Sequence, residues 1–476
     1  MRPRREILHG GSDIIRFLAS KSLSFTLFGV PGLKRIFISI FALVAASVTI
    51  CCGYKNNSTT TTQKPSGFTF RVFISNPLFP TGGGAIGTNV PVLNILDALH
   101  DVLSTSLVSL SGDSTQPGLM ALSPNLKFTL VYSPAGNTVT AVDNATEAVA
   151  TASGSTSTLP PFALAGSTES IVVSPFNTTA FAAVPTAPVS GESPGAVEVL
   201  NLQSGGIEAS IPVPGAHFVI CSPDGNHVLV FSDNSDTVTV ITTILIGTAT
   251  DPRTYITGFD RPVWGIFTNG ATAYIFNCGA QCGGKSAGIS VLNLGASTPT
   301  STTPVTAATY GLLSGSTLYV VGTAPPNPPG TNTCTGTTTA ATTCGTLSVV
   351  DTSSMAVSRT TVITDGYHDR MQLSQNGQLY IGSHSCTNIS IPGGEVRGCL
   401  SIYNTNSPSV VIPQNNGDVT GIQQITGRDI VYVVQNGALQ IYNTDTNELQ
   451  VTPGDTQNNN GQVDIVGQLS DVKLVD

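Results

Sequence analysis

The sequence predicts an all-β fold, a β-propeller built from four-stranded blades. Three observations predict it: a composition poor in charge, one repeated strand pattern, and a final segment that completes the first repeat. Charged residues make up only 10% of the 476 residues, and there are 49 glycines and 30 prolines. Such a composition favours many short strands joined by polar turns over a helical bundle or an acidic disordered tail.

The clearest repeat is a strand that ends in Asp or Asn and is followed by a turn. The side chains of Asp and Asn bond the backbone two residues further on, so they end a strand and start a turn. Successive copies are about 39 to 58 residues apart. The positions are Asp97, Asp143, Asn201, Thr242 (a degenerate copy), Asn293, Asp351, Asn404 and Asn443.

Another strand, strongly apolar or of alternating polarity, precedes each of these strands that end in Asp or Asn. Before it lies another strand that ends in a tight turn, as in 171–176, 219–225 and 371–377, and a fourth segment follows, as in 207–213 and 358–364. The unit is therefore four strands, named a to d, at the period of a propeller blade. The b strands are expected at 71–76, 128–133, 179–184, 227–232, 272–277, 317–322, 378–383 and 429–434.

The two ends of the repeat region complement each other. The first unit begins at Phe68 with strands b, c and d but without strand a, and the final segment 463–476 has the pattern of one more strand a. That strand would complete the first blade and remove the free sheet edges. We therefore expect a propeller over 68–476 with eight blades, with seven as the alternative, preceded by a flexible polar linker over 53–67.

The N-terminal segment 1–52 is predicted to direct export. Residues 36–50 are an uncharged apolar run that follows Lys34 and Arg35, which is typical of a secretory signal and short for a membrane span. Cys51 and Cys52 come next, and the segment resembles a bacterial lipoprotein signal, which implies lipidation, with Cys52 preferred to Cys51. Plain cleavage and an uncleaved membrane anchor remain the alternatives. The expected location is the periplasm or outer surface.

The repeats resemble the YVTN family of bacterial β-propellers, named for Tyr-Val-Thr-Asn in strand b. The matching segments are 72–76 (VFISN), 222–225 (SPDG) and 348–352 (SVVDT), and the resemblance covers 68–476. It implies an exported propeller of seven or eight blades. Since propellers host both binding and catalysis, it leaves the activity open.

The charge balance limits the partners. The net charge is −9, and segment 1–52 contributes seven basic and two acidic residues, so the remainder is more acidic still. We expect no nucleic-acid partner and a membrane contact only through the N-terminus. A cell-envelope protein or glycan is the expected partner of a monomeric propeller.

Six of the cysteines form three local pairs, each between strands b and c of one unit. Pairs at such spacing predict disulfides in an oxidising compartment, whereas a zinc site needs four ligands close together. We therefore expect no metal and no cofactor. The pairs are Cys278 with Cys282, Cys334 with Cys344, and Cys386 with Cys399, and Cys221 is expected to be a buried free thiol.

Polar residues gather where strand a begins, at the mouth of the expected central channel. They are His217, Asp260, Arg261, Trp264, His368, Asp369, Arg370 and Asp418. Such a ring of His, Asp and Arg predicts a site for an anionic ligand, a metal or a small substrate. Ordinary hydrogen bonds and ion pairs between blades are the alternative. His368 and Asp369 are adjacent, so we expect them to point to opposite faces of their strand.

No catalytic residues are assigned from the sequence. The first hypothesis is a non-enzymatic, envelope-anchored propeller that binds a ligand or serves as a scaffold. The second is a lactonase-like hydrolase at the channel mouth, which the resemblance implies because some YVTN-type propellers are similar to that group; His217, Asp260 or His368 would then cluster within hydrogen-bond reach. The third is a passive structural component of a surface layer.

Overall fold

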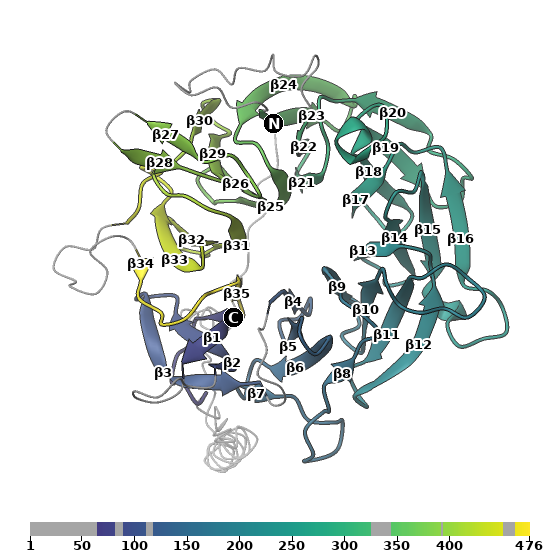
Figure 1. Ribbon diagram of the computed structural model, residues 1–476, viewed down its shortest axis with the longest axis horizontal. Helices are drawn as coiled ribbons and strands as arrows, with labels where there is room; N and C mark the ends of the chain where they lie inside the picture. The colour runs from purple at the N-terminus through teal and green to yellow at the C-terminus, as the bar shows by residue number, and fades with distance from the viewer. Residues whose placement is uncertain (1–63, 81–88, 111–117, 325–343, 392–393, 451–461) are drawn as a thin grey trace, which may run out of the picture. The chain divides into compact units, whose positions relative to one another are not determined.

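The computed structural model describes residues 64–80, 89–110, 118–324, 344–391, 394–450 and 462–476. The proposed signal, Cys51 and Cys52 lie outside these residues. Lys64–Asp476 is one compact unit, in which eight four-stranded antiparallel sheets form a ring around a channel (Figure 1). The prediction of an eight-bladed β-propeller is confirmed. Within the described residues, no helix has the length and apolar character needed to cross a membrane.

The first four blades follow the predicted units closely. Blade 2 carries one further short strand, β8, which pairs with β6. The strands of blades 1 to 4 are β1 (Arg71–Pro80), β2 (Asn89–Asp97), β3 (Val102–Ser109); β4 (Met120–Leu122), β5 (Phe128–Ser133), β6 (Thr138–Asp143), β7 (Ala148–Val149), β8 (Phe162–Ala163); β9 (Ser170–Val173), β10 (Thr179–Val184), β11 (Ala196–Asn201), β12 (Gly206–Pro212); β13 (Ala216–Cys221), β14 (His227–Ser232), β15 (Thr237–Thr242) and β16 (Arg253–Thr257).

Three of the other four blades, blades 5 to 7, carry long loops between strands b and c, whereas blade 8 has a short turn there. Blade 7 has a separate hairpin, β27–β28, inserted between its second and third strands. The strands of blades 5 to 8 are β17 (Pro262–Phe267), β18 (Thr272–Asn277), β19 (Gly288–Asn293), β20 (Ser301–Pro304); β21 (Tyr310–Ser314), β22 (Thr317–Thr323), β23 (Gly345–Asp351), β24 (Ala356–Ile363); β25 (Tyr367–Leu373), β26 (Gln378–His384), β27 (Ile389–Ile391), β28 (Glu395–Arg397), β29 (Leu400–Asn404), β30 (Ser409–Val411); β31 (Val419–Gln424), β32 (Ile430–Gln435), β33 (Ala438–Asn443) and β34 (Gln462–Val463).

The C-terminal strand β35 (Asp471–Leu474) closes the ring. It pairs antiparallel with β1, with Val72 opposite Leu474 and Ser75 opposite Asp471, and becomes the inner strand of blade 1. The predicted closing segment, 463–476, begins too early. Its first residue, Val463, belongs to β34, the outer strand of blade 8. Closure pairs the free edge of β1, which would otherwise expose unpaired backbone groups.

The Asp and Asn residues at the ends of the c strands form the expected turns. Oδ1 of Asp143 accepts hydrogen bonds from the backbone N–H groups of Ala145 and Thr146. Asn201 and Asn404 form the same bonds in their own blades. Each turn is therefore built locally, which is why the repeat can be recognised in the sequence.

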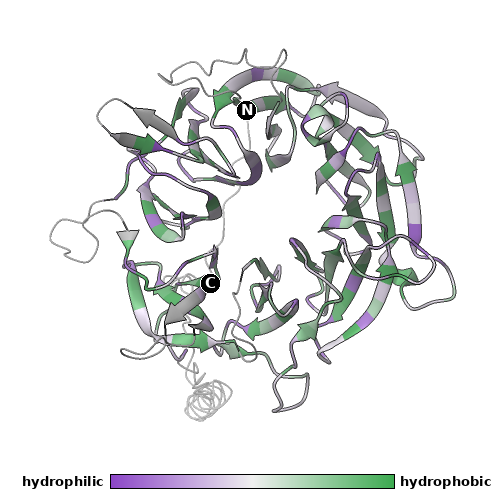
Figure 2. Ribbon diagram, in the orientation of Figure 1, coloured by the Kyte–Doolittle hydropathy of each residue, from purple (hydrophilic) through white to green (hydrophobic). Residues whose placement is uncertain are grey.

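The hydrophobic core lies between neighbouring blades. The middle strands are buried on both faces, as in β5 and β14, whereas outer strands such as β24 are largely exposed. Figure 2 shows apolar residues along the blades and a strongly hydrophilic stretch on β25 beside the channel. Residues 64–67, assigned to the linker from the sequence, contact the ring through Ser66, whose backbone N–H and hydroxyl group donate to Glu147.

Candidate functional site in the central channel

A cavity of about 660 Å³ occupies the mouth of the channel. Its wall combines residues at the starts of the inner strands with residues from the loops between strands b and c, so both kinds of segment meet at one face. We call this space the mouth cavity. Four of the predicted residues line it: His217, Arg261, Asp369 and Arg370.

The inner strands carry β-bulges near this mouth. The pairing register shifts between Ala216 and Phe218 in β13 and between His368 and Arg370 in β25, and similar shifts occur at the starts of β17 and β31. A bulge places an extra residue in one strand and changes the direction of its neighbours. This explains how consecutive residues, such as Asp369 and Arg370, both line the cavity.

On one side of the mouth, His217 lies between two carboxylates. Its Nδ1 is 2.5 Å from Oδ1 of Asp233, and its Nε2 is 3.0 Å from Oε2 of Glu169. Burial lowers the pKa of His217, but the hydrogen bonds to Glu169 and Asp233 outweigh this and raise it to about 9. The imidazole is therefore charged at neutral pH, and the same contact lowers the pKa of Glu169.

On blade 7, the carboxylate of Asp369 lies beside the imidazole of His384 and the guanidinium of Arg370. Its Oδ2 lies 3.7 Å from Nδ1 of His384 and 3.8 Å from Nη2 of Arg370. The contact with Asp369 is the main reason that the pKa of His384 is raised. Within the described part of the chain, the guanidinium of Arg370 has no hydrogen bond, although only 26% of its side chain is exposed. Arg370 therefore keeps donors available for an anion.

Arg261 is held at the rim by its backbone and by blade 4. Its φ of 56° lies in the left-handed region, which is uncommon for a long side chain. Its backbone N–H donates to Oδ1 of Asp236, and its guanidinium donates to the carbonyl of Asn234. The guanidinium of Arg261 thus has a hydrogen-bond acceptor within the protein, which the guanidinium of Arg370 lacks among the described residues.

Below the mouth, the channel continues as an inner cavity of about 220 Å³. The two cavities share Glu169, Phe218, Asp369 and Arg370 in their walls. The predicted residue Trp264 lines the inner cavity rather than the mouth.

Three of the predicted residues lie outside both cavities and have partners of their own. His368 is fully buried, its Nε2 lies 3.0 Å from the carbonyl of Thr364, and burial lowers its pKa to about 4, so it is neutral at neutral pH. As expected, it points away from Asp369. The carboxylate of Asp260 accepts hydrogen bonds from the backbone of Lys285 and Ser286, at 3.0 and 2.7 Å.

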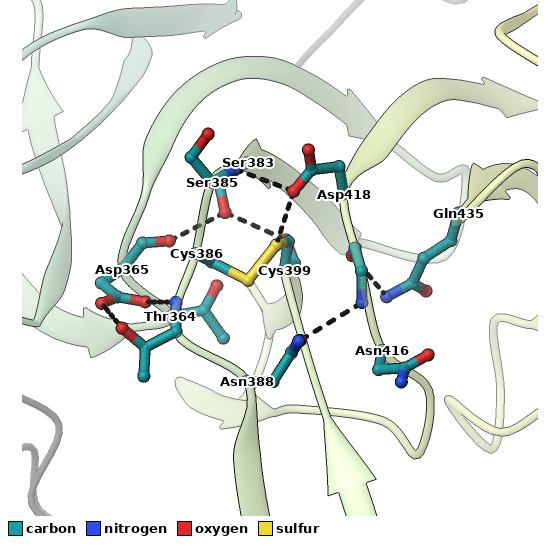
Figure 3. Close-up of a disulfide and its surroundings, with 12 residues drawn as sticks. Thr364, Asp365, Ser383, Ser385, Cys386, Asn388, Cys399, Asn416, Asp418 and Gln435 are labelled. Atoms are coloured by element: carbon teal, nitrogen blue, oxygen red, sulfur yellow. Dashed lines mark hydrogen bonds between the residues drawn. A yellow bond between two sulfur atoms is a disulfide. The ribbon is translucent and has the colours of Figure 1, made fainter.

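Asp418 is the third of these residues, and it lies beside a disulfide (Figure 3). Its Oδ1 accepts a hydrogen bond from the backbone N–H of Ser385 at 2.8 Å and lies 3.6 Å from Sγ of Cys399. It lines a different depression, between blades 8 and 1. His217, Asp260 and His368 therefore have separate hydrogen-bond partners, and no hydrogen bond joins any two of them.

Two predicted disulfides are present, Cys278–Cys282 and Cys386–Cys399. Each closes a loop between strands b and c, and Cys282 lines the mouth cavity. The third pair involves Cys334, which lies outside the described residues. Cys221 is the one free cysteine of the described residues; it is half-buried, and burial raises the pKa of its thiol to about 12.

Sequence reasoning did not single out Glu169, Asp233 and His384, which supply much of the charge at the mouth. The expectation that the chain has no phosphate-loop motif is also wrong, because residues 279–286 have the Gly-x-x-x-x-Gly-Lys-Ser spacing of such a loop. Here the loop joins two strands, and its backbone N–H groups at Lys285 and Ser286 bind the carboxylate of Asp260. The anion held by this loop is therefore a side chain of the protein itself.

No protein-family model matches the chain, and no curated protein sequence matches it. Among solved structures, it is similar to dihydro-heme d1 dehydrogenase NirN in complex with DHE, with a TM-score of 0.56 and 12% identity over 85% of this chain and 75% of that one. For hydrazine synthase of Kuenenia stuttgartiensis, the TM-score is 0.50 and the identity 14%, over 69% and 95%. For a periplasmic gluconolactonase of Pseudomonas aeruginosa, the TM-score is 0.42 and the sequence identity is 14%, over 86% of this chain and 99% of that one. At these identities the likeness concerns the fold alone: the chain is a β-propeller.

Proposed function

We propose that this protein is an exported, non-enzymatic binding propeller that receives a small anionic ligand in its central channel. The observation that carries the proposal is Arg370, a guanidinium inside the channel that has no hydrogen bond within the described residues. A charged donor in a confined site gains most when it meets an acceptor of opposite charge. Arg261 lines the same mouth cavity and adds positive charge.

The contacts of His217 favour binding over hydrolysis. A general base must be unprotonated near the working pH and must reach the substrate proton. Both ring nitrogens of His217 are already engaged by Glu169 and Asp233, and its pKa is raised to about 9. The carboxylate of Asp260 is also fully engaged, by backbone N–H groups.

A thermal-melt screen of the purified protein, with its disulfides intact, tests the proposal. The panel holds sulfate, phosphate, simple carboxylates, divalent metals, a chelator and simple lactones. An anion at 100 times its Kd should add about 2.7 kcal/mol to the free energy of unfolding, which gives a visible shift. Arg370→Gln should reduce the shift to about half or less, whereas Arg359→Gln, on the exposed outer strand β24, should retain it in full.

Two results of the thermal-melt screen would contradict the proposal. If no anion shifts the melt, the ligand-binding function is wrong, and the scaffold or surface-layer hypothesis takes its place. If a lactone is turned over, and the turnover depends on His217, the hydrolase hypothesis takes its place.

Membership of the YVTN family, export and a lipid anchor at Cys52 belong to the same proposal. The two disulfides support an oxidising compartment, because such bonds persist outside the cytosol. Metabolic labelling with a fatty-acid analogue tests the anchor. Label that is lost in Cys52→Ala but kept in Cys221→Ala would support lipidation, and an unlabelled protein would refute it.

A further inference from the structure

The inner cavity indicates which class of anion the channel takes. We propose that the ligand is an aromatic carboxylate whose ring packs against Phe218, Trp264 and Tyr310 while its carboxylate pairs with Arg370. This inference rests on the proposed function, since it assumes that Arg370 receives the anion. It adds the chemistry of the rest of the ligand.

The three aromatic side chains form a continuous strip on the inner strands of three neighbouring blades. The rings of Phe218 and Trp264 are 5.6 Å apart and nearly perpendicular, and those of Trp264 and Tyr310 are 5.2 Å apart and tilted by 32°. These separations are typical of favourable aromatic pairs. All three side chains are only partly buried and line the inner cavity, so the strip offers a surface to a further ring.

The inner cavity is lined by two cationic side chains: Arg370 on blade 7, next to the blade of Tyr310, and Lys473 on blade 1, across the ring from the strip. Lys473 is paired with the buried carboxylate of Asp471 at 3.2 Å. Arg370 shares Asp369 with His384, at 3.8 and 3.7 Å, and has no hydrogen bond within the described residues. The cavity is therefore aromatic over part of its wall and offers a cationic donor beside it, which fits a ligand with a ring at one end and one negative group at the other.

The aliphatic hydroxyl groups of the cavity wall, those of Thr309 and Ser170, argue against a sugar acid; the other hydroxyls of the wall are the phenols of Tyr310 and Tyr367. A sugar requires several hydrogen-bonding groups, and those offered by Thr309 and Ser170 are already used. Thr309 donates to the carbonyl of His368 at 2.7 Å, and Ser170 bonds the backbone N–H of Val219 at 3.0 Å. An aromatic ring requires no hydrogen-bonding groups from the cavity wall.

The single tryptophan makes the test direct, because Trp264 reports its own surroundings. Phenylacetate is titrated into the full protein while tryptophan fluorescence is followed. Its Kd is compared by calorimetry with those of cyclohexylacetate and glucuronate, which carry the same charge. We expect phenylacetate to change the fluorescence and to bind about 3- to 10-fold more tightly than either competitor.

Variants separate the two ends of the ligand. Arg370→Gln should weaken phenylacetate by about tenfold or more, and Arg359→Gln should leave it unchanged. Tyr310→Leu should bring phenylacetate down to the affinity of cyclohexylacetate while leaving the latter within about twofold. Trp264→Phe keeps a ring in the strip, so it should retain the preference, measured by calorimetry. A thermal melt confirms that each variant is folded.

The possible results distinguish the aromatic preference from the proposed binding of anions in general. Equal binding of all three anions, weakened by Arg370→Gln, would overturn the aromatic preference and leave anion binding intact. Tightest binding of glucuronate would overturn it in favour of a sugar acid. Failure of every anion, in this assay and in the thermal screen, would overturn both.

Discussion

The guanidinium of Arg71 and the carboxylate of Asp476, 405 residues apart, form a two-point ion pair at the seam of the ring. Nε of Arg71 lies 2.7 Å from Oδ2 of Asp476, and Nη2 lies 2.8 Å from Oδ1. Nη1 binds Glu147 and the carbonyl of Asn144, on blade 2. Because Arg71 is 1% exposed, this charge depends on its partners, and the pair joins β1 to the end of the closing strand.

We predict that Asp476→Asn destabilises the protein by about 1–3 kcal/mol. Among the residues that the structure describes, the change leaves Glu147 as the one acidic partner of the buried Arg71, and breaking a buried pair costs more than the pair contributes. Chemical denaturation measures the loss. Asp464→Asn, at an exposed position, is the matched control and should change stability by less than about 0.5 kcal/mol.

The same pair predicts a loss of stability in acid. Burial raises the pKa of Asp476, but its bonds to Arg71 and Lys64 outweigh this and lower it. A carboxylate with a lowered folded-state pKa contributes stability above its unfolded pKa, and the contribution is lost as pH falls through the folded value. The acid-induced fall in melting temperature should therefore be smaller in Asp476→Asn; an unchanged pH profile would contradict this role of the pair.

The two disulfides should differ in their contribution. Cys278–Cys282 closes a loop with a sequence separation of 4, and Cys386–Cys399 one with a separation of 13. Because the stabilisation grows with loop length, we expect losses of about 2 and about 3 kcal/mol for the double serine variants. Denaturation curves of each variant, compared with that of the reduced protein, measure the difference, and an equal loss would argue against the chain-entropy explanation.

The fold could be predicted because its signals are local. The turn of Asp143 requires only its own neighbours, and the same side-chain chemistry recurs in each blade. The eight-bladed count also depended on one remote pairing, that of β35 with β1, which the missing first strand indicated.

The site could be predicted only in part, because it depends on register and on contacts between blades. Asp369 and Arg370 line one cavity because β25 carries a bulge, which alternation along a strand does not indicate. Glu169 and Asp233 meet His217 from separate loops, and nothing in their local sequence marks them. Asp260 was expected at the mouth but instead binds the backbone of a stapled loop.

His217 predicts a loss of stability in alkali. Its pKa is raised to about 9 by Glu169 and Asp233, against the burial that lowers it. A histidine with a raised folded-state pKa contributes stability that is fully present below its unfolded pKa, near 6.5, and is lost as pH rises through about 9. The melting temperature should therefore fall between about pH 6.5 and 9, and His217→Gln should flatten this part of the profile. A fall that persists in His217→Gln would assign the effect to another group.

His384 predicts that anion binding strengthens as pH falls. The contact with Asp369 raises the pKa of His384, burial and Arg370 oppose this, and Asp418 and Glu169 act on it from blades 8 and 3. An anion at Arg370 adds negative charge nearby, so the bound state favours the charged imidazole, and binding takes up a proton. Calorimetry of phenylacetate binding in buffers with different ionisation enthalpies measures that proton. His384→Asn should remove the uptake and the pH dependence, whereas His100→Asn, at an exposed side chain on blade 1, should leave both in place. Proton uptake that survives in His384→Asn would show that another group at the channel responds to the ligand.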